Sequence, residues 1–299
     1  MHIKGFIKYL QFERRASQDT LQAYQSDLGQ CASFLRAQYD IKKIEEAQAR
    51  HLRSWLVALL KDRMARTTVK RKHSTLKSYF NYLHKYHNLK ANPMLKVPAP
   101  KIGQRLPVFL AERETQNLFE RLEWGPDFPA QRDRLILLLF YTAGIRRAEL
   151  IRLRWQDIDW QGPYLKVLGK GNKERLIPFG AQLAKALQEY QVLCKETFGE
   201  MTSEQALLLT DKGKPLYPKL VYNKVRSYLQ QVSQELKLSP HVLRHTFATH
   251  LSNNGADLNA IKELLGHSSL AATQVYTHNT IEQLKEIYKQ AHPKAKSDQ

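Results

Sequence analysis

The sequence predicts a mainly α protein of two domains, with a small antiparallel β-sheet in the second domain. Three observations lead to this fold class. Residues 1 to about 90 place apolar side chains at helical spacing and contain no alternating strand pattern. A proline-rich, basic stretch follows them. Beyond it, segments with helical periodicity flank three short β segments.

The first domain, residues 1–92, is expected to be almost wholly helical. One helix is predicted over Thr20 to Gln38, where apolar side chains recur at Leu21, Tyr24, Leu28 and Cys31 or Ala32. Another helix is predicted to start near Thr67 or Thr68, because either hydroxyl could cap it. Its inward face would carry Val69, Leu76, Phe80 and Leu83. Its other face would present Lys70, Arg71, His73 and Lys77.

Residues 93–107 are expected to link the two domains. The stretch contains four prolines, at Pro93, Pro98, Pro100 and Pro107. Proline removes a backbone donor and restricts the residue before it, so a helix or a central strand is disfavoured here. Three cations make the stretch basic, namely Lys96, Lys101 and Arg105. We therefore expect an extended linker, with a domain boundary near residue 100.

The second domain, residues 108–299, mixes helices with a short β region. Strands are expected over Asp157 to Trp160, Tyr164 to Leu168 and Glu174 to Phe179. Glycine and asparagine in Gly169–Asn172 allow a tight turn, which predicts a hairpin with Lys170 at its tip. Helices are expected over Leu106 to Leu122, Arg132 to Leu150, Gln182 to Thr197, Tyr217 to Leu236, His241 to Asn253, Asp257 to Leu265, Ala271 to Thr277 and Ile281 to Gln290.

The charge of the chain indicates a polyanionic partner. Its 47 Lys and Arg residues and 28 Asp and Glu residues give a net charge of +19. Nucleic acid is the commonest such partner, although an anionic membrane surface or a ribosomal location gives the same composition. The run from Lys61 to His73 is strongly basic and is either a solvated helix face or a contact for the DNA backbone. Aromatic residues close by, Tyr79, Phe80 and Tyr82, favour DNA contact.

The sequence gives no sign of export or of a membrane span. Met1 to Leu10 lacks the continuous apolar core of a secretory signal. The longest apolar stretch, Leu135 to Tyr141, is far shorter than the ~18 residues of a membrane span, so it predicts a buried helix. Cys31 and Cys194 lie outside any metal-ligand spacing, which predicts reduced thiols. We expect a cytoplasmic protein that uses no metal and no cofactor.

Five elements of the second domain carry residues suited to phosphate chemistry. They hold Arg146 just after Gly144, Lys170 in the hairpin turn, His241 and Arg244 one helical turn apart, His267 after Gly266, and Tyr276. Taken singly, each has an ordinary alternative, such as a salt-bridged arginine, a solvated lysine or a half-buried tyrosine. His241 and His245 could bind zinc, but Arg244 would place a cation against the metal. The GKGN turn lacks the spacing of a nucleotide-binding phosphate loop.

Five motifs follow one another along this domain. They are R-x-x-E-L (Arg146 to Leu150), G-K-G-N-K-E-R (Gly169 to Arg175), H-x-L-R-H-T-F-A-T-H (His241 to His250), L-G-H-S-S (Leu265 to Ser269) and T-x-V-Y-T-H (Thr273 to His278). Their order and spacing closely resemble the tyrosine recombinase (phage integrase) family, with its Xer-type branch nearest. Arg147 and Ala148 depart from the aliphatic and small polar residues common in relatives, and Lys262 replaces a commonly uncharged one.

The resemblance covers nearly the whole second domain. The N-terminal helices also resemble the core-binding domain of that family. It therefore implies a two-domain clamp, in which a helical core-binding (DNA-binding) domain precedes an α+β catalytic domain. It also implies an enzyme, a site-specific DNA recombinase that needs neither metal nor ATP.

The residue types suit attack on a phosphodiester. Such attack needs a clamp for the charge that develops on the phosphoryl oxygens. Arg146 and Arg244 are expected to form it, because a guanidinium offers a fixed fork of donors. His267 would add a further donor. Glu149 would orient Arg146 without touching DNA.

Bond cleavage also needs a nucleophile and an acid. We expect Tyr276 to attack and form a 3′-phosphotyrosyl bond, which releases a 5′-hydroxyl. Lys170 would protonate that hydroxyl, and His241 would assist proton transfer from the phenol. An unperturbed phenol titrates near 10, so it needs cationic surroundings to attack at neutral pH.

The resemblance also implies partners. They are double-stranded DNA with inverted-repeat half-sites, and a homo- or heterotetramer formed with a paralogous recombinase. The Xer-type role would be the resolution of chromosome or plasmid dimers, linked to chromosome partition and cell division, with a septal DNA translocase as a further partner. The C-terminal helix, with Ile281, Leu284 and Ile287 at helical spacing, either docks on its own core or passes to a neighbouring protomer, as the resemblance implies.

Other functions stay open on sequence alone. A transposon- or phage-borne integrase of the same family, or a type IB topoisomerase, would share the nucleophile and the arginines. A DNA-binding protein with a decayed, noncatalytic site is the alternative from another class.

Overall fold

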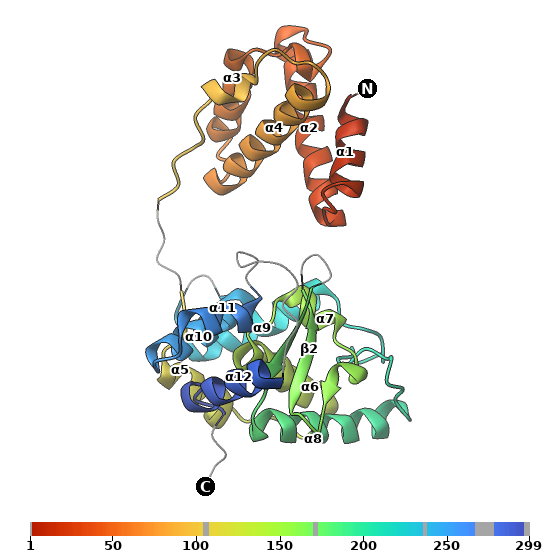
Figure 1. Cartoon of the computed structure of the whole chain (residues 1–299), viewed down its shortest axis with the longest axis vertical. Coiled ribbons are helices and arrows are strands. Elements are labelled where there is room, and N and C mark those ends of the chain that lie inside the picture. The colour runs from red at the N-terminus through yellow and green to blue at the C-terminus, as the bar shows by residue number, and fades with distance from the viewer. Residues whose placement is uncertain (1, 104–107, 170–172, 236–237, 267–277, 296–299) are drawn as a thin grey trace. The chain divides into compact units, whose positions relative to one another are not determined.

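The chain consists of two compact units, Met1–Arg105 and Leu106–Gln299, each with a hydrophobic core of its own (Figure 1). The computed structural model describes residues 2–103, 108–169, 173–235, 238–266 and 278–295. For residues 278–281 it describes the backbone only. The architecture is mainly helical, with one small antiparallel sheet in the second unit. The predicted fold class is therefore confirmed.

The first unit is a bundle of four helices. They are α1 (His2–Phe12), α2 (Gln18–Tyr39), α3 (Ala49–Lys61) and α4 (Arg66–Tyr86), with the short 3₁₀ turns η1 (Ile44–Glu46) and η2 (Pro93–Lys96). Helix α2 packs against the other three helices. It begins at Ser17, whose hydroxyl accepts a hydrogen bond from the backbone N–H of Thr20. The predicted helix over residues 20–38 lies within it.

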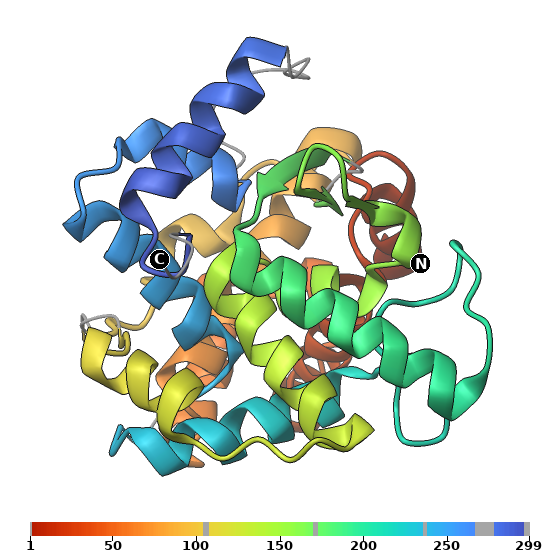
Figure 2. The ribbon, with the colours of Figure 1, turned by 90° about the horizontal axis from the view of Figure 1, so that it is seen from below.

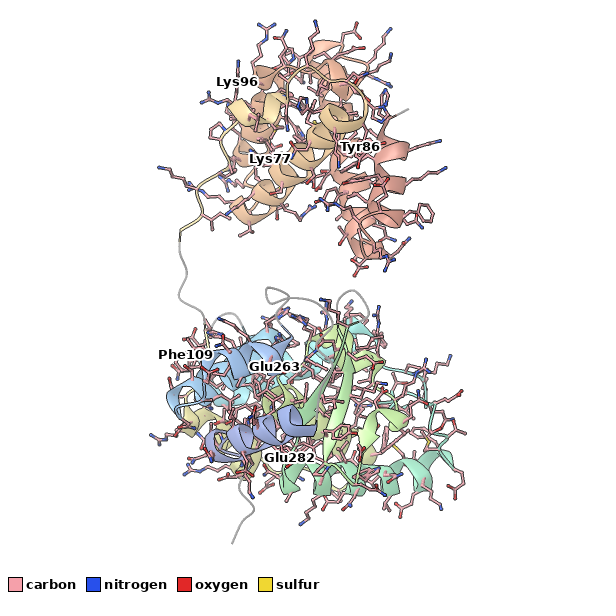
Figure 3. The ribbon with its side chains drawn as sticks, viewed as in Figure 1. Lys77, Tyr86, Lys96, Phe109, Glu263 and Glu282 are labelled. Carbon is pink, nitrogen blue, oxygen red and sulfur yellow. The ribbon has the colours of Figure 1, made fainter. Side chains whose placement is uncertain are left out.

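Helix α4 differs from its prediction at two points. It starts earlier than predicted, because Ala65 occupies the cap position and Thr67 and Thr68 already lie in the first turn. His73 is buried instead of facing outward, and its Nε2 lies 2.7 Å from the carbonyl oxygen of Val97. The predicted inward residues are buried, and Lys70 and Arg71 are exposed as expected. Lys77, labelled in Figure 3, is exposed as well.

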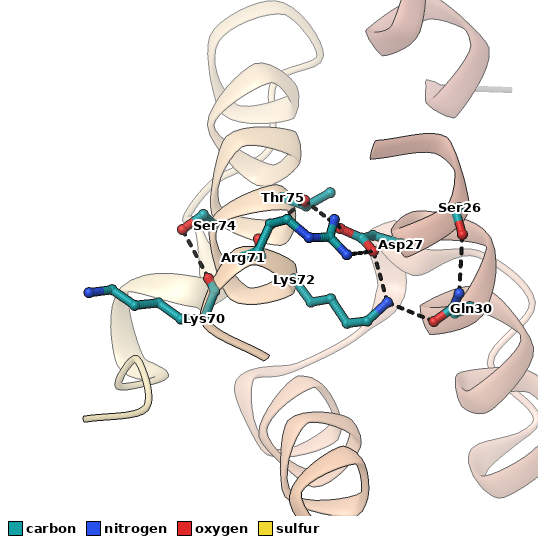
Figure 4. A network of polar contacts seen from close by, with 8 residues as sticks. All are labelled: Ser26, Asp27, Gln30, Lys70, Arg71, Lys72, Ser74 and Thr75. Carbon is teal, nitrogen blue, oxygen red and sulfur yellow. Dashed lines mark hydrogen bonds and ion pairs between the residues drawn. The ribbon is translucent and has the colours of Figure 1, made fainter. Parts of the chain in front are cut away.

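Two basic residues of α4 bind one buried carboxylate, that of Asp27 on α2 (Figure 4). The Arg71 guanidinium donates to both oxygens of Asp27. The Lys72 ammonium donates to Asp27 at 2.8 Å and to Gln30 at 2.7 Å, and its side chain is only 3% exposed. The hydroxyl of Thr75 adds a further donor at 2.9 Å. Lys72 is therefore occupied within the fold and cannot contribute to the predicted basic surface.

Part of the stretch that was expected to be a linker packs against the first unit. Residues 93–96 form the turn η2, which contacts α3 and α4. Asn92 caps this turn by accepting a hydrogen bond from the N–H of Met94 at 2.8 Å. Met94 and Val97 are both buried in the core of the unit. Proline at the first position of such a turn needs no backbone donor, which explains why Pro93 is tolerated.

The second unit surrounds one central helix. Its elements are α5 (Glu112–Gln116), the π-helical turn η3 (Asn117–Arg121), α6 (Phe128–Ala143), α7 (Arg147–Arg152), η4 (Trp155–Asp157), β1 (Ile158–Asp159), β2 (Tyr164–Leu168), β3 (Glu174–Pro178), α8 (Ala181–Phe198), α9 (Pro218–Val232), α10 (Pro240–Asn253), α11 (Leu258–Leu265) and α12 (His278–Ala291). Helix α6 contacts α8, α9 and α10. Residues 135–141 are buried within it, as predicted from their apolar run.

The sheet has the order β1-β2-β3, with antiparallel neighbours throughout. Val167 pairs with Arg175, and Leu165 pairs with Ile177. All four side chains are buried, so they share the inward face of the hairpin. The predicted hairpin is confirmed, whereas the position of Lys170 at its tip lies outside the described residues.

Two helices of the second unit are shorter than predicted. The helix expected over residues 132–150 is broken, because α6 ends at Gly144 with a φ of 56° and α7 starts after Arg146. The helix expected from Leu106 begins only at Glu112. Before it, the backbone N–H of Leu110 donates to Thr246 at 2.9 Å. The helix expected over 271–277 lies outside the described residues.

Helix α12 docks on its own unit, beside α10, α11 and β3 (Figures 1 and 2). Leu284, Tyr288 and Ala291 are buried there. The side-chain amide of Asn254 donates to the carbonyl oxygen of Ala291 at 2.8 Å. His292 is also buried, with its Nε2 3.1 Å from the carbonyl oxygen of Tyr141. In the single chain this helix thus docks in cis, and its exchange with a neighbouring protomer stays a prediction.

Candidate active site

The site is built where α6 ends and α7 begins. Gly144 closes α6 in the left-handed conformation, and a Cβ at this position would collide with the ring of Phe247. The tight turn sets Arg146 at the cap position of α7. Its side chain is 35% exposed, and its guanidinium donates to the carbonyl oxygen of Gly266 at 3.2 Å. Arg146 is thus held at the surface with donors still facing solvent.

Glu149 is the buried carboxylate at the centre of the site. It accepts hydrogen bonds from the backbone N–H of Arg146 at 2.8 Å and from the Arg146 guanidinium at 2.7 Å. Burial alone would raise its pKa, but Arg175 and Arg146 outweigh that effect and lower the pKa to about 2. Glu149 therefore stays ionised and orients Arg146, as the sequence suggested.

Arg175 is the partner that the sequence prediction missed. Its side chain is 4% exposed, and its two terminal nitrogens donate to the two oxygens of Glu149 at 2.8 and 3.2 Å. Its Nε donates to the carbonyl oxygen of Leu264 at 2.8 Å. One signal was available in the sequence. The strand alternation places Arg175 on the same face as Ile177, so a buried charge needing a partner could have been expected.

Arg244 approaches the same place from α10. It is buried, and its guanidinium donates to the carbonyl oxygens of Gly144 and of Leu265, the latter at 2.7 Å. These carbonyls belong to the ends of α6 and α11, where backbone acceptors lack helical partners. Burial and the charges of Arg146 and Arg175 lower the pKa of Arg244 to about 10. It still carries its proton at neutral pH.

His241 lies one turn before Arg244 on α10 and is exposed. Loss of hydration around the ring lowers its pKa, and the charges of Arg244, Arg147 and Arg146 lower it further. A neutral imidazole at neutral pH can accept a proton, which a histidinium cannot. The structure thus brings His241, Arg146 and Arg244 into one electrostatic neighbourhood.

The remaining predicted residues, Lys170, His267 and Tyr276, lie outside the described residues. The turn that precedes position 267 is described. Gly266 ends α11 with a φ of 64°, as predicted, and Arg146 and Arg244 both donate to carbonyl oxygens of this turn. Within the described ranges, no group of three or more His, Cys, Asp or Glu residues could hold a metal ion. None of the helices described is long and apolar enough to cross a bilayer.

Family comparison matches both units. Residues 109–283 match the phage integrase family, and residues 3–87 match the N-terminal SAM-like domain of phage integrases. The chain is 36% identical to tyrosine recombinase XerC of Chlorobaculum parvum, over 98% of this chain and 94% of that protein. It is 38% identical to tyrosine recombinase XerC of Pelotomaculum thermopropionicum, over 99% of each.

Solved structures share the fold. The XerH site-specific recombinase bound to a palindromic difH substrate, in a post-cleavage complex, matches with a TM-score of 0.69 and 22% identity, over 96% of this chain and 84% of that one. The Tn1549 transposon integrase in complex with transposon right end DNA matches with a TM-score of 0.70 and 17% identity, over 95% and 98%. With near full-length relatives above 30% identity, the chain belongs to the phage integrase family and is a site-specific tyrosine recombinase.

Proposed function

We propose that Arg146 and Arg244 bind one phosphate of DNA and that Tyr276 attacks its phosphorus. One observation carries this proposal. Three guanidiniums, those of Arg146, Arg175 and Arg244, gather around the single carboxylate of Glu149, which leaves an excess of two positive charges. Such an excess in a partly buried place favours an anion with several acceptor oxygens, as a phosphodiester has.

The reaction would proceed by exchange of one ester for another. The phenolic oxygen of Tyr276 forms a bond to phosphorus while the bond to the 5′-oxygen breaks. His241 takes up the phenolic proton, and Lys170 gives a proton to the departing 5′-oxygen. His267 donates to a nonbridging oxygen beside the two arginines. A 3′-phosphotyrosyl bond and a 5′-hydroxyl result.

Rejoining reverses these steps with a 5′-hydroxyl from another strand. The number of phosphoester bonds is unchanged, so no ATP is required to restore the backbone. The guanidiniums supply the charge that a metal ion supplies in other phosphoryl-transfer enzymes. We therefore propose that the chain works without metal or ATP.

We further propose that residues 1–92 form the core-binding domain, that 93–107 link it to the catalytic domain, and that 108–299 catalyse. Five cations of the basic run are exposed. Arg71 is paired with Asp27, and the other four, Lys61, Arg63, Arg66 and Lys70, would contact the DNA backbone. Each neutralised phosphate adds roughly −0.9 to the slope of log affinity against log salt concentration. A slope near zero, measured by fluorescence anisotropy, would contradict this DNA contact.

The biological role would be resolution of chromosome or plasmid dimers in the cytoplasm. It would act at a short inverted-repeat site, with four protomers of this chain or of this chain and a paralogue, and with a septal DNA translocase as a further partner. The similarity to XerC proteins supports this role over that of a transposon or phage integrase. Deletion of the gene should then leave chromosome dimers unresolved. Normal chromosome partition in the deletion strain would argue against this role.

A trapping experiment tests the chemistry directly. Nicked duplexes with a randomised core are incubated with the full chain, because a nick near the cleavage point lets the freed short strand diffuse away and leaves the enzyme attached. We expect a covalent adduct on a denaturing gel, and sequencing of the trapped DNA reveals the target site. Tyr276→Phe should bind the selected DNA without forming an adduct. An adduct formed by this variant would show that the nucleophile is another residue.

A further inference from the structure

We infer that Arg175 is a positioning residue of strand cleavage, which holds Glu149 against Arg146 and fixes the turn at Gly266. Its role rests on the proposed function, since it acts through Arg146 and not on DNA itself. Arg175 lies on the inward face of β3, and its side chain is almost completely buried. DNA therefore cannot reach it while the domain is folded.

Every nitrogen of the Arg175 guanidinium has a partner. Both terminal nitrogens donate to Glu149, and Nε donates to the carbonyl oxygen of Leu264. These bonds join three segments that are distant in the sequence, namely β3, the start of α7 and the end of α11. The first belongs to the hairpin that leads to Lys170, and the last precedes His267. The Arg175 side chain thus connects the segments that carry or precede three proposed catalytic residues, namely Lys170, Arg146 and His267.

Two glycine turns pass close to this guanidinium, and one of the glycines, Gly266, makes room for it. A Cβ on Gly266 would lie 3.0 Å from Cδ and 3.2 Å from Nη1 of Arg175, which is tighter than ordinary contact. A Cβ on Gly169 would lie 3.6 Å from Nη1 of Arg175 and 3.7 Å from Glu149. The backbone of both turns therefore passes close to the Arg175–Glu149 pair. The pair gives a physical reason for glycine at the end of α11, in addition to its positive φ.

Charge explains how Arg175 influences Arg146. Glu149 has one negative charge, which it shares between the two arginines. With Arg175 removed, Glu149 would lose the partner that opposes its burial, so its pKa would rise. A protonated Glu149 could no longer accept both bonds from Arg146.

A pH profile separates this role from a purely structural one. Arg146, Arg175 and, more distantly, Arg244 face Glu149 in the described part of the chain. Further charged groups line the pocket of about 570 Å³ beside it, namely Arg152, Arg154, Asp157, Lys166, Glu174 and Glu204. In the wild type, Glu149 is ionised at every usable pH. In Arg175→Met, the rate relative to wild type should fall as the pH is lowered from about 8 to about 5, through the raised pKa of Glu149.

The experiment measures single-turnover adduct formation on the selected nicked duplex, together with DNA affinity and melting temperature. Arg175→Met should slow adduct formation by about 10- to 100-fold, the usual size when an outer partner of a functional group is removed. DNA affinity should change by less than about threefold, since Arg175 touches no phosphate. Lys185→Met, an equal loss of charge on the exposed surface of α8, should leave the rate unchanged.

A double-mutant cycle tests the path through Glu149. If Arg175 acts through Glu149, Arg175→Met should cost little in a Glu149→Gln background, and its relative pH profile should become flat. Equal losses in both backgrounds, or a wild-type rate in Arg175→Met, would overturn the inference. If Arg175→Met fails to fold, Arg175→Lys takes its place. Arg175→Lys keeps one ion pair and should give an intermediate rate.

Two failures can be told apart. If the wild type forms no adduct, or Tyr276→Phe still forms one, the proposed function is wrong. If the wild type forms the adduct, Tyr276→Phe does not, and the Arg175 variants cleave normally, only the role of Arg175 is wrong.

Discussion

Each unit of the protein buries a carboxylate among cations, but the two clusters differ in how much positive charge stays unneutralised. In the first unit, Asp27 binds Arg71 and Lys72, and Lys72 also donates a hydrogen bond to Gln30. In the second unit, Glu149 binds Arg175 and Arg146. There a third guanidinium, that of Arg244, lies close by and donates to neutral carbonyl oxygens.

The two clusters therefore differ in whether positive charge remains for a ligand. The Asp27 cluster joins α2 to α4 and hides its lysine, so it serves the packing of the bundle. Each cluster leaves one arginine partly exposed, Arg71 at 46% and Arg146 at 35%. They differ in charge, because the guanidinium of Arg244 gives the Glu149 cluster one more positive charge than the Asp27 cluster has. Positive charge that the fold leaves unneutralised is available to a ligand.

The largest expected effect concerns the Asp27 cluster. Asp27→Asn leaves Arg71 and Lys72 without a counter-charge, which should reduce the stability of the first unit by about 3–5 kcal/mol. Hydrogen exchange of the amides in α2 and α4 reports this unit separately from the other. Asp19→Asn, on the exposed first turn of the same helix, serves as the control and should cost less than about 1 kcal/mol. Equal protection in both variants would mean that the cluster does not hold the bundle.

The next effect concerns the third guanidinium. Arg244→Lys keeps the charge but cannot reach both carbonyl oxygens and a phosphate, so adduct formation should slow by about 10²–10³-fold. Single-turnover cleavage of the selected nicked duplex measures it. Ser252→Ala, exposed near the end of the same helix, should react at the wild-type rate. A rate within twofold of wild type in Arg244→Lys would break the contrast between the two clusters.

A smaller effect concerns the pH dependence of the Glu149 cluster. The folded-state pKa of Glu149 is about 2, below its ordinary value of 4.5. Its contribution to stability is therefore complete above about pH 4.5 and is lost as the pH falls toward 2. Between about pH 5 and pH 3 the second unit should lose about 2 kcal/mol from this group alone. Urea unfolding at both pH values, compared with Glu149→Gln, isolates that share, and an identical loss in the variant would contradict it.

The smallest effect concerns the start of α4. Ala65 occupies the cap position without a side-chain acceptor. Ala65→Ser should add one and stabilise the first unit by about 0.5–1 kcal/mol, well below the contribution of Asp27. The shift in the urea midpoint of this unit measures it, with Thr67→Ser as the control inside the first turn. A gain as large as the Asp27 loss would mean that local capping, and not the ion cluster, governs the helix.

The sequence predicted those features that depend on local pattern. The spacing of apolar residues predicted the inward face of α4 and the buried run of α6. The turn residues Gly169–Asn172 predicted the hairpin. Arg146, His241 and Arg244 were recognisable from motif order, and the structure brings them into one neighbourhood. Their roles, with those of Lys170, His267 and Tyr276, remain predictions.

The missed features depend on partners far away in the chain. His73 is buried because the carbonyl of Val97 lies within reach, and Lys72 is buried because Asp27 lies opposite on another helix. Arg175 needs Glu149 and Leu264 before its burial makes sense. The break at Gly144 was missed because apolar residues continue through it. Helical periodicity records which face is apolar, but it does not record which buried polar group finds a partner.

The hydrogen bonds of Arg244 within the fold limit how this position can change in evolution. The same guanidinium donates to carbonyl oxygens at the ends of α6 and α11, where backbone acceptors lack helical partners. If Arg244 acts as proposed, a substitution there would impair both the reaction and the stability of the domain. Loss of activity by drift at this position would thus be accompanied by loss of the folded chain, and an inactive but well-folded descendant would have to arise through changes elsewhere.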